Sequence, residues 1–278
     1  MILVTGATGT VGRHVAVQLS DMGVDVRAMV HRTPAVDLPD RVKTVEADLA
    51  VPESLADHLD GVDAVFLVWP FVSPDQTAEL APRVVAELTK RPRRIVYLSA
   101  TPAADEPGSF WARVEQAIRD SGAPHTFLRP SGFAKNVLMW ADQIRSGDEV
   151  RWTYGDAVRS LIHEADIAAV AVRALVEDGH DGKAYALTGP SAHRQAEQVE
   201  IIGEVLGRPL RWVELPVEAA REQLRQEWGD AGFADAALAA WARFVTEPEP
   251  VTSVVQQVTG RPARSFRQWV AEHVDAFR

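Results

Sequence analysis

The chain has 278 residues, of which 46% are hydrophobic and 24% are charged, as in ordinary globular proteins. This length supports one large domain or two closely packed ones. The absence of cysteine excludes a disulfide framework, a thiolate zinc site and a cysteine nucleophile. The net charge of −10 argues against a nucleic-acid partner, which would need clustered Lys and Arg to neutralise phosphates.

The N-terminal residues show neither the basic stretch nor the cleavage site of a signal peptide. The most apolar run, Ala64–Val72, is interrupted by Pro70 and is too short to span a bilayer. We therefore expect a cytoplasmic protein without a membrane partner.

Short apolar runs alternate with amphipathic segments in the first half of the chain, which predicts alternating strands and helices. The predicted strands are Ile2–Thr5, Asp25–Val30, Val42–Glu46, Ala64–Val68, Arg94–Leu98 and His125–Leu128. The predicted helices are Gly12–Met22, Pro52–Asp60, Pro74–Lys90 and Ser109–Ser121. Because parallel strands need such crossover helices, the pattern indicates an α/β fold with a doubly wound parallel sheet of the Rossmann type.

Helices dominate after Pro130, where only one short strand, Ala184–Leu187, is predicted. The predicted helices are Ala134–Ser146, Asp166–Glu177, Gln195–Leu206, Val217–Trp228, Phe233–Val245 and the aromatic Phe266–Phe277. We therefore expect a sheet domain at 1–130 and a smaller, mostly helical region at 131–278 packed intimately against it.

The first predicted strand ends in a glycine-rich turn, and a helix follows it. Gly6 permits a tight turn, Gly9 lets a pyrophosphate approach the backbone, and Gly12 lets the helix pack closely. The helix N-terminus then presents free N–H groups and a positive dipole end to the anion. The residues of this turn predicted to contact a dinucleotide are Gly6, Thr8, Gly9, Thr10, Val11 and Gly12.

The end of the second strand indicates which dinucleotide binds. An acidic residue about 20 positions after the loop would bind the free 2′-hydroxyl of NAD, but this chain has His31-Arg32-Thr33 there. The guanidinium of Arg32 suits a 2′-phosphate, and His31 adds a donor. We expect NADP(H) to be preferred and leave NAD(H) open. Asp48 and Leu49 follow the third strand and are predicted near the adenine, with Asp48 in a capping or positioning role.

These features resemble the NmrA-like branch of the atypical short-chain dehydrogenase/reductase superfamily, over nearly the whole chain. Besides the loop, the segments that carry the resemblance are Val26–Arg32, Ser121–Phe133, Ile162–Ala168, Lys183–Pro190 and Val258–Pro262. Members of this branch include NAD(P)H-dependent quinone reductases, tailoring enzymes of aromatic natural products and inactive cofactor-sensing regulators.

The resemblance also implies a substrate cleft outside the carboxyl ends of the strands. Trp69 would border both the cofactor and the substrate. The other residues implied as cleft walls are Pro70, Phe71, Ser99–Thr101, Pro130–Phe133 and Asn136, together with parts of the C-terminal region. Trp111 and Trp140 are further candidates for aromatic walls. Aromatic walls of this kind suit a flat ring.

The usual catalytic signature of the superfamily, Tyr-x-x-x-Lys, is absent. The residues four positions after Tyr97, Tyr154 and Tyr185 are Thr101, Val158 and Gly189. Trp111 stands where many members of the branch carry Lys or His. The departure disfavours acid catalysis on a simple carbonyl, whereas reduction of a quinone yields a weakly basic hydroquinone anion and tolerates the loss of a strong proton donor.

Ser99 ends the fifth strand, where the superfamily's catalytic serine lies, and is predicted to bind a carbonyl oxygen or to be a turn hydroxyl. Arg129 is predicted to pair with Asp166 or another acid, and Asp166 to cap the helix that it opens. His163 is predicted to be either a proton donor or, as a lone histidine, a structural residue. No metal site is expected.

We therefore predict an NAD(P)H-dependent oxidoreductase acting on a quinone or an aromatic polyketide-like small molecule. Two alternatives stay open at this point. One is an NADP(H)-sensing regulatory protein without turnover, and the other is a tailoring enzyme with non-reductive chemistry such as isomerisation, cyclisation or oxygenation. A homo-oligomer is also left open.

Overall fold

The computed structural model describes residues 1–31, 38–91 and 93–278 and divides into two compact units. The first unit comprises Met1–Pro130, Glu164–Leu187 and Val254–Arg261. The second comprises Ser131–His163, Thr188–Ser253 and Pro262–Arg278.

The first unit is built on a seven-stranded sheet in the order β3-β2-β1-β4-β5-β6-β9, with every neighbouring pair parallel. Its strands are β1 (Ile2–Val4), β2 (Val26–Val30), β3 (Lys43–Glu46), β4 (Ala64–Val68), β5 (Arg94–Leu98), β6 (His125–Pro130) and β9 (Lys183–Leu187). The order reverses between β1 and β4, where ligands bind in doubly wound sheets. The predicted Rossmann-type fold is confirmed.

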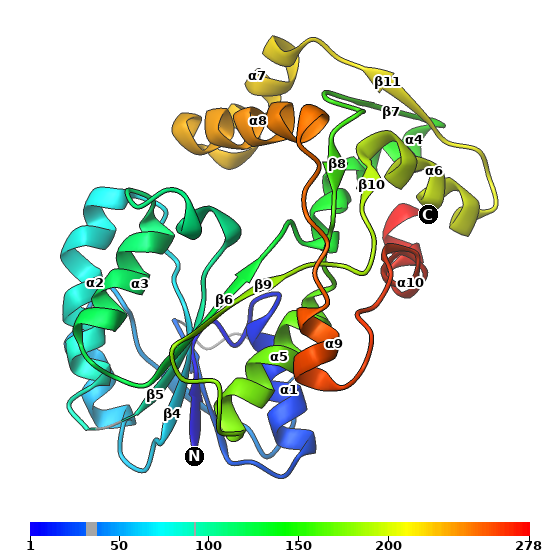
Figure 1. Ribbon diagram of the computed structural model, residues 1–278. Coiled ribbons are helices and arrows are strands. Elements are labelled where there is room, and N and C mark those ends of the chain that lie inside the picture. The colour runs from blue at the N-terminus through cyan, green and yellow to red at the C-terminus, as the bar shows by residue number, and fades with distance from the viewer. Residues whose placement is uncertain (32–37, 92) are drawn as a thin grey trace. The chain divides into compact units, whose positions relative to one another are not determined.

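Helices cover both faces of this sheet (Figure 1). α2 (Pro74–Leu88) and α3 (Phe110–Asp120) pack together on one face. α1 (Gly12–Asp21), α5 (Glu164–Val176) and α9 (Val254–Thr259) lie on the other. Two short 3₁₀ helices, η1 (Pro52–His58) and η2 (Thr101–Ala104), complete this unit among the described residues.

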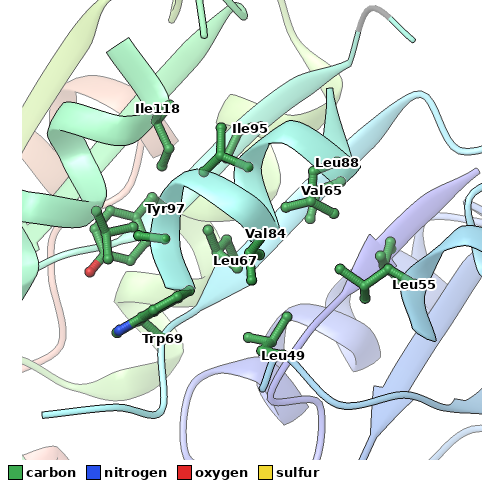
Figure 2. Close-up of a cluster of buried hydrophobic side chains, with 14 of the residues drawn as sticks. Leu49, Leu55, Val65, Leu67, Trp69, Val84, Leu88, Ile95, Tyr97 and Ile118 are labelled. Atoms are coloured by element: carbon green, nitrogen blue, oxygen red, sulfur yellow. The ribbon is translucent and has the colours of Figure 1, made fainter. Parts of the chain in front are cut away.

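The core under α2 and α3 explains why the strands of the first half were predictable. Val65, Leu67, Ile95 and Tyr97 point from β4 and β5 into this core (Figure 2). Residues between them, such as Phe66 and Val96, are equally buried and face the other helix layer. A strand that is covered on both faces reads as a continuous apolar run.

The second unit joins short strands to helices. Its strands form a parallel pair, β7 (Glu149–Trp152) with β11 (Arg211–Glu214), and an antiparallel pair, β8 (Val158–Arg159) with β10 (His193–Arg194). Its helices are η3 (Ala134–Trp140), α4 (Ala141–Ser146), α6 (Gln195–Leu206), α7 (Val217–Trp228), α8 (Ala231–Thr246), α10 (Phe266–Glu272) and η4 (Val274–Phe277). Tryptophans dominate its core, with Trp140, Trp152, Trp241 and Trp269 all buried.

The grouping of segments differs from the predicted division into 1–130 and 131–278. Residues 164–187 and 254–261 group with the first unit, because α5 covers one face of the sheet and β9 extends it beside β6. The strand predicted at Ala184–Leu187 therefore belongs to the main sheet. A local hydrophobic pattern carries no information about such a return of the chain.

Several predicted helices are shorter or divided. Ala134–Ser146 splits into η3 and α4, and Phe266–Phe277 splits at His273 into α10 and η4. The short strands β7, β8, β10 and β11 were not predicted, because two to four residues show no clear alternation. Within the part of the chain that the structure describes, no helix is long and apolar enough to cross a membrane.

Candidate functional site

The glycine turn lies at the carboxyl end of β1 and leads into α1. Gly6 has a φ of +58°, a conformation that favours glycine, and its carbonyl accepts a hydrogen bond from the Gly9 N–H at 2.9 Å. A Cβ on Gly12 would lie 2.2 Å from the Gly6 oxygen, so α1 starts in direct contact with the turn. The hydroxyl of Thr5 holds the base of the turn to β4, accepting from the Val68 N–H at 2.7 Å.

This turn fits the phosphates of a dinucleotide. α1 begins after Val11 without a side-chain cap, and its first turn carries no acidic residue. Thr8 and Gly9 are exposed, so the backbone there is accessible. Unpaired N–H groups and a positive dipole end at an open turn favour an anion. Contacts of Thr8, Thr10 and Val11 with the cofactor stay predictions.

The carboxyl ends of β2 and β3 lie beside this turn in the sheet order. His31 Nδ1 lies 3.4 Å from Asp48 Oδ2, and both side chains are exposed to solvent. Asp48 Oδ1 also accepts from the Ala50 N–H at 2.8 Å, which closes a local turn after β3. Arg32 and Thr33 lie outside the described residues, so the role of Arg32 stays a prediction.

Leu49, which was predicted near the adenine, has a buried side chain. The side chain is 3% exposed and packs in the core beneath α2, as Figure 2 shows. Leu49 packs into the hydrophobic core of the sheet, so only its backbone can contact a ligand.

The predicted aromatic wall after β4 is only partly available. Trp69 is 8% exposed, and its Nε1 donates to the Thr77 hydroxyl at 2.9 Å, which turns the ring toward α2. Phe71 meets it edge-on with ring centroids 5.2 Å apart and stays half-buried, while Pro70 is exposed. Phe71 and Pro70 can therefore contact a ligand more readily than Trp69.

Ser99, directly after β5, is part of a buried charged network. Its Oγ donates to Glu115 Oε1 at 2.7 Å, and Glu115 on α3 is fully buried. Arg129 on β6 binds the same carboxylate with two N–H groups, Nε to Oε1 at 2.9 Å and Nη2 to Oε2 at 2.6 Å. The predicted structural pairing of Arg129 with an acid is confirmed, and its partner is Glu115.

The contacts within this network keep Glu115 and Arg129 in their charged forms. Burial raises the pKa of Glu115, but hydrogen bonds from Arg129 and Ser99 and the charges of Arg129 and Arg119 outweigh it, so the net pKa is lowered. The hydrogen bonds that Arg129 donates to Glu115 raise the pKa of Arg129. Glu115 is therefore a carboxylate at neutral pH.

Neither neighbouring aromatic residue supplies an acid. Tyr97 is fully buried, its phenol has no partner among the described residues, and burial together with the Glu115 charge holds its pKa well above the usual range. Trp111 is half-buried on α3, with its ring tilted against that of Phe110 and the two ring centroids 4.0 Å apart. An indole has no titratable proton at neutral pH, so Trp111 can wall a site but cannot protonate a substrate.

The predicted substrate residues of the second unit differ in exposure. Phe133 is half-buried and Asn136 is exposed. Trp140 is 1% exposed and packs edge-on against Trp212 at 5.6 Å, so it belongs to the core of that unit and is wrong as a cleft wall. A shared cleft with residues of the first unit stays a prediction.

His163 and Asp166 are both buried. His163 Nε2 lies 3.0 Å from Glu272 Oε2, which favours the structural interpretation of this histidine. Asp166 was wrongly predicted to cap its helix, because α5 already begins at Glu164.

Sequence reasoning missed Glu115, the residue on which the Ser99 environment depends. A signal was present, because Glu115 lies three positions from both Ala112 and Ile118, which are buried on the same helix. A carboxylate on the apolar face of a helix needs a cationic partner, and Arg129 in the next strand supplies it.

Known proteins resemble the whole chain. Residues 6–178 match the NAD(P)H-binding family. A (4-alkanoyl-5-oxo-2,5-dihydrofuran-3-yl)methyl phosphate reductase of Streptomyces griseus is 44% identical, covering 100% of this chain and 99% of that protein. An NAD(P)H azoreductase of Xenophilus azovorans is 36% identical, again covering 100% and 99%.

A solved structure shares the fold. The NADPH-dependent quinone oxidoreductase of Escherichia coli, crystallised with NADPH, has a TM-score of 0.80 at 23% identity and covers 99% of this chain and 100% of that one. The two full-length reductase relatives confirm the predicted class of NAD(P)H-dependent oxidoreductase. The chain therefore belongs to the NAD(P)H-binding family.

Proposed function

We propose that the protein uses NADPH to reduce a conjugated small molecule, such as a quinone or an aromatic polyketide-like compound. The observation that carries this proposal is the absence of an available acid at the end of β5 among the described residues. The Ser99 hydroxyl is occupied by Glu115, Tyr97 is enclosed in the core, and Trp111 cannot donate a titratable proton.

A conjugated acceptor suits such a site. The bound nicotinamide supplies a hydride, and a quinone that receives it becomes a hydroquinone anion whose charge is delocalised. That anion takes its proton from water, so the protein needs mainly to bind and orient the two reactants. A simple ketone would become a strongly basic alkoxide and would require a general acid.

The relatives favour the same chemical class. One is named for a dihydrofuranone that bears an acyl group, one for azo compounds, and one for quinones. Each of these acceptors has an electron-poor double bond in conjugation. The 44% identity with the furanone phosphate reductase makes a phosphorylated furanone a necessary member of any substrate panel.

The described residues and the sequence together suggest how the chain holds its cofactor. The turn from Gly6 to Gly12 and the N-terminus of α1 would hold the pyrophosphate, and His31 with Arg32 would hold the 2′-phosphate of NADPH. Phe71 and Trp111 are half-exposed aromatic residues of the first unit that would contact a flat ring. The proposed location is the cytoplasm, because the reaction consumes a cofactor that cells regenerate there.

The test is calorimetric titration with NADPH and NADH, followed by addition of acceptors while the absorbance of the reduced nicotinamide is recorded. The acceptor panel contains naphthoquinones, an azo dye and a 4-alkanoyl-5-oxo-dihydrofuranyl methyl phosphate. Tighter binding of NADPH and loss of the absorbance with any of these acceptors supports the proposal.

Tight binding of NADPH without turnover of any acceptor would refute the reductase. Unequal affinities for NADPH and NADP would then favour a sensor. Conversion of an acceptor without consumption of NADPH would favour non-reductive tailoring chemistry.

A further inference from the structure

The direction of one hydrogen bond limits what Ser99 can do. Its hydroxyl lies 2.7 Å from Glu115 Oε1, and its backbone N–H is used by the Leu128 carbonyl at 2.8 Å. Glu115 is fully buried, so its carboxylate is shielded from water. Because an ionised carboxylate only accepts hydrogen bonds, the hydroxyl of Ser99 must be the donor.

Two arginines keep Glu115 ionised. Arg129 binds it in a fork at 2.9 and 2.6 Å, and Arg119 Nη2 reaches Oε2 at 2.7 Å. The other ionisable groups acting on this network are Tyr97, which stays a neutral phenol, and Asp105, which acts on Arg129. A buried carboxylate with two cationic partners does not take up a proton near neutral pH.

We propose that Glu115 is a positioning residue that fixes Ser99 as a hydrogen-bond acceptor, so that the ligand bound at the end of β5 presents an N–H or O–H donor to the Ser99 oxygen. The O–H points toward α3, so the Ser99 oxygen, in a residue that is 3% exposed, has only its lone pairs to offer a ligand. A ligand carbonyl would meet these lone pairs and be repelled. This inference rests on the proposed function and reverses the predicted role of Ser99, which was to bind a carbonyl oxygen.

Two ligand groups could supply the donor at this place. Ligands of parallel α/β sheets bind beyond the carboxyl ends of the strands, and Ser99 directly follows β5. One source is the carboxamide NH₂ of the nicotinamide. The other is a hydroxyl group on the acceptor itself.

The first experiment separates these sources in the wild type and in Ser99→Ala. Affinity is measured for NADPH and for its 3-acetylpyridine analogue, in which a methyl group replaces the amide NH₂. Turnover is measured for 6-hydroxy-1,4-naphthoquinone and its methyl ether. In one of the two pairs, the wild type should favour the donor-bearing compound about two- to tenfold more than Ser99→Ala does.

Ser99→Ala leaves Glu115 with both arginines, so the fold is retained. Equal ratios in the two proteins for both pairs would overturn the proposal. A wild type that favours the donor-free compound more than Ser99→Ala does would overturn it as well. The cofactor titration needs no turnover, so a protein that reduces no quinone refutes the proposed function without deciding this inference.

Glu115→Gln tests the positioning role. The amide can donate to Ser99 and release its hydroxyl, so the discrimination measured for the wild type should fall toward that of Ser99→Ala. The ratio is compared only after circular dichroism shows a folded protein, and a merely structural role for Glu115 would leave it unchanged. If Glu115→Gln does not fold, the comparison with Ser99→Ala decides the proposal.

Discussion

Gly12→Ala should damage cofactor binding through a single methyl group. A Cβ at this position would lie 2.2 Å from the Gly6 oxygen and 2.7 Å from the Gly6 carbonyl carbon. Close C···O contacts in proteins lie at roughly 3.3–3.6 Å, so the turn or the helix must move by about 1 Å. Both obstacles are backbone atoms, which cannot rotate away as a side chain does.

The size of the effect follows from the overlap. Forcing one extra methyl into a packed site costs roughly 1–3 kcal/mol, which corresponds to about 5- to 150-fold in an equilibrium constant. If the glycine turn opens to relieve the strain, the phosphate site changes shape, and the free-energy cost appears mainly as weaker NADPH binding. If the turn keeps its shape, the loss falls on stability.

Calorimetric titration with NADPH and a thermal melt measure both components. Gly147→Ala is the matched control, because no atom lies within 4 Å of its added Cβ and its φ of −174° suits any residue. The control should keep the affinity and Tm of the wild type. A Gly12→Ala protein with a Kd within about twofold of the wild type and an unchanged Tm would refute the reasoning.

Three further changes test other parts of the molecule. Arg93→Met should lower the stability by roughly 2–4 kcal/mol and spare the affinity for NADPH, because it leaves four main-chain carbonyls without the guanidinium that now binds them; an unchanged Tm would contradict this. His31→Ala should weaken NADPH binding about three- to tenfold and leave NADH binding nearly unchanged, as calorimetry with both cofactors measures; equal losses would count against a 2′-phosphate contact. The lowered pKa of Glu115 contributes stability above its unfolded value of about 4.5, and this stability is lost as the pH falls through the folded pKa. Melts between pH 3 and 7 should therefore show the Tm difference between wild type and Glu115→Gln shrinking below about pH 4.5, and a constant difference would show that the carboxylate is not responsible.

Local patterns were enough to predict the sheet and the cofactor turn. Ala64–Val68 and Arg94–Leu98 were predicted with their observed bounds, because strands buried on both faces are continuous apolar runs between polar ends. The glycine spacing from Gly6 to Gly12 is likewise read along a few neighbouring residues. Such features depend on backbone conformation and burial within one short segment.

Which side chains are exposed, and which distant segments pack together, could be read only from the tertiary structure. Leu49 and Trp140 are apolar residues of the kind that can contact a ligand. Each is instead enclosed in a hydrophobic core by segments distant in sequence. The return of 164–187 and 254–261 to the sheet is equally invisible in a local pattern.

The Ser99 network shows why local sequence patterns could not predict such contacts. Ser99 directly follows β5, Glu115 lies on α3 and Arg129 lies on β6, and each is an ordinary residue within its own segment. Packing those elements side by side buries the carboxylate, which then requires the arginine and orients the serine hydroxyl. The sequence alone determines the strands, the turn and the kind of cofactor, because these follow from neighbouring residues. The direction of a hydrogen bond is decided only when folding removes water from three segments at once.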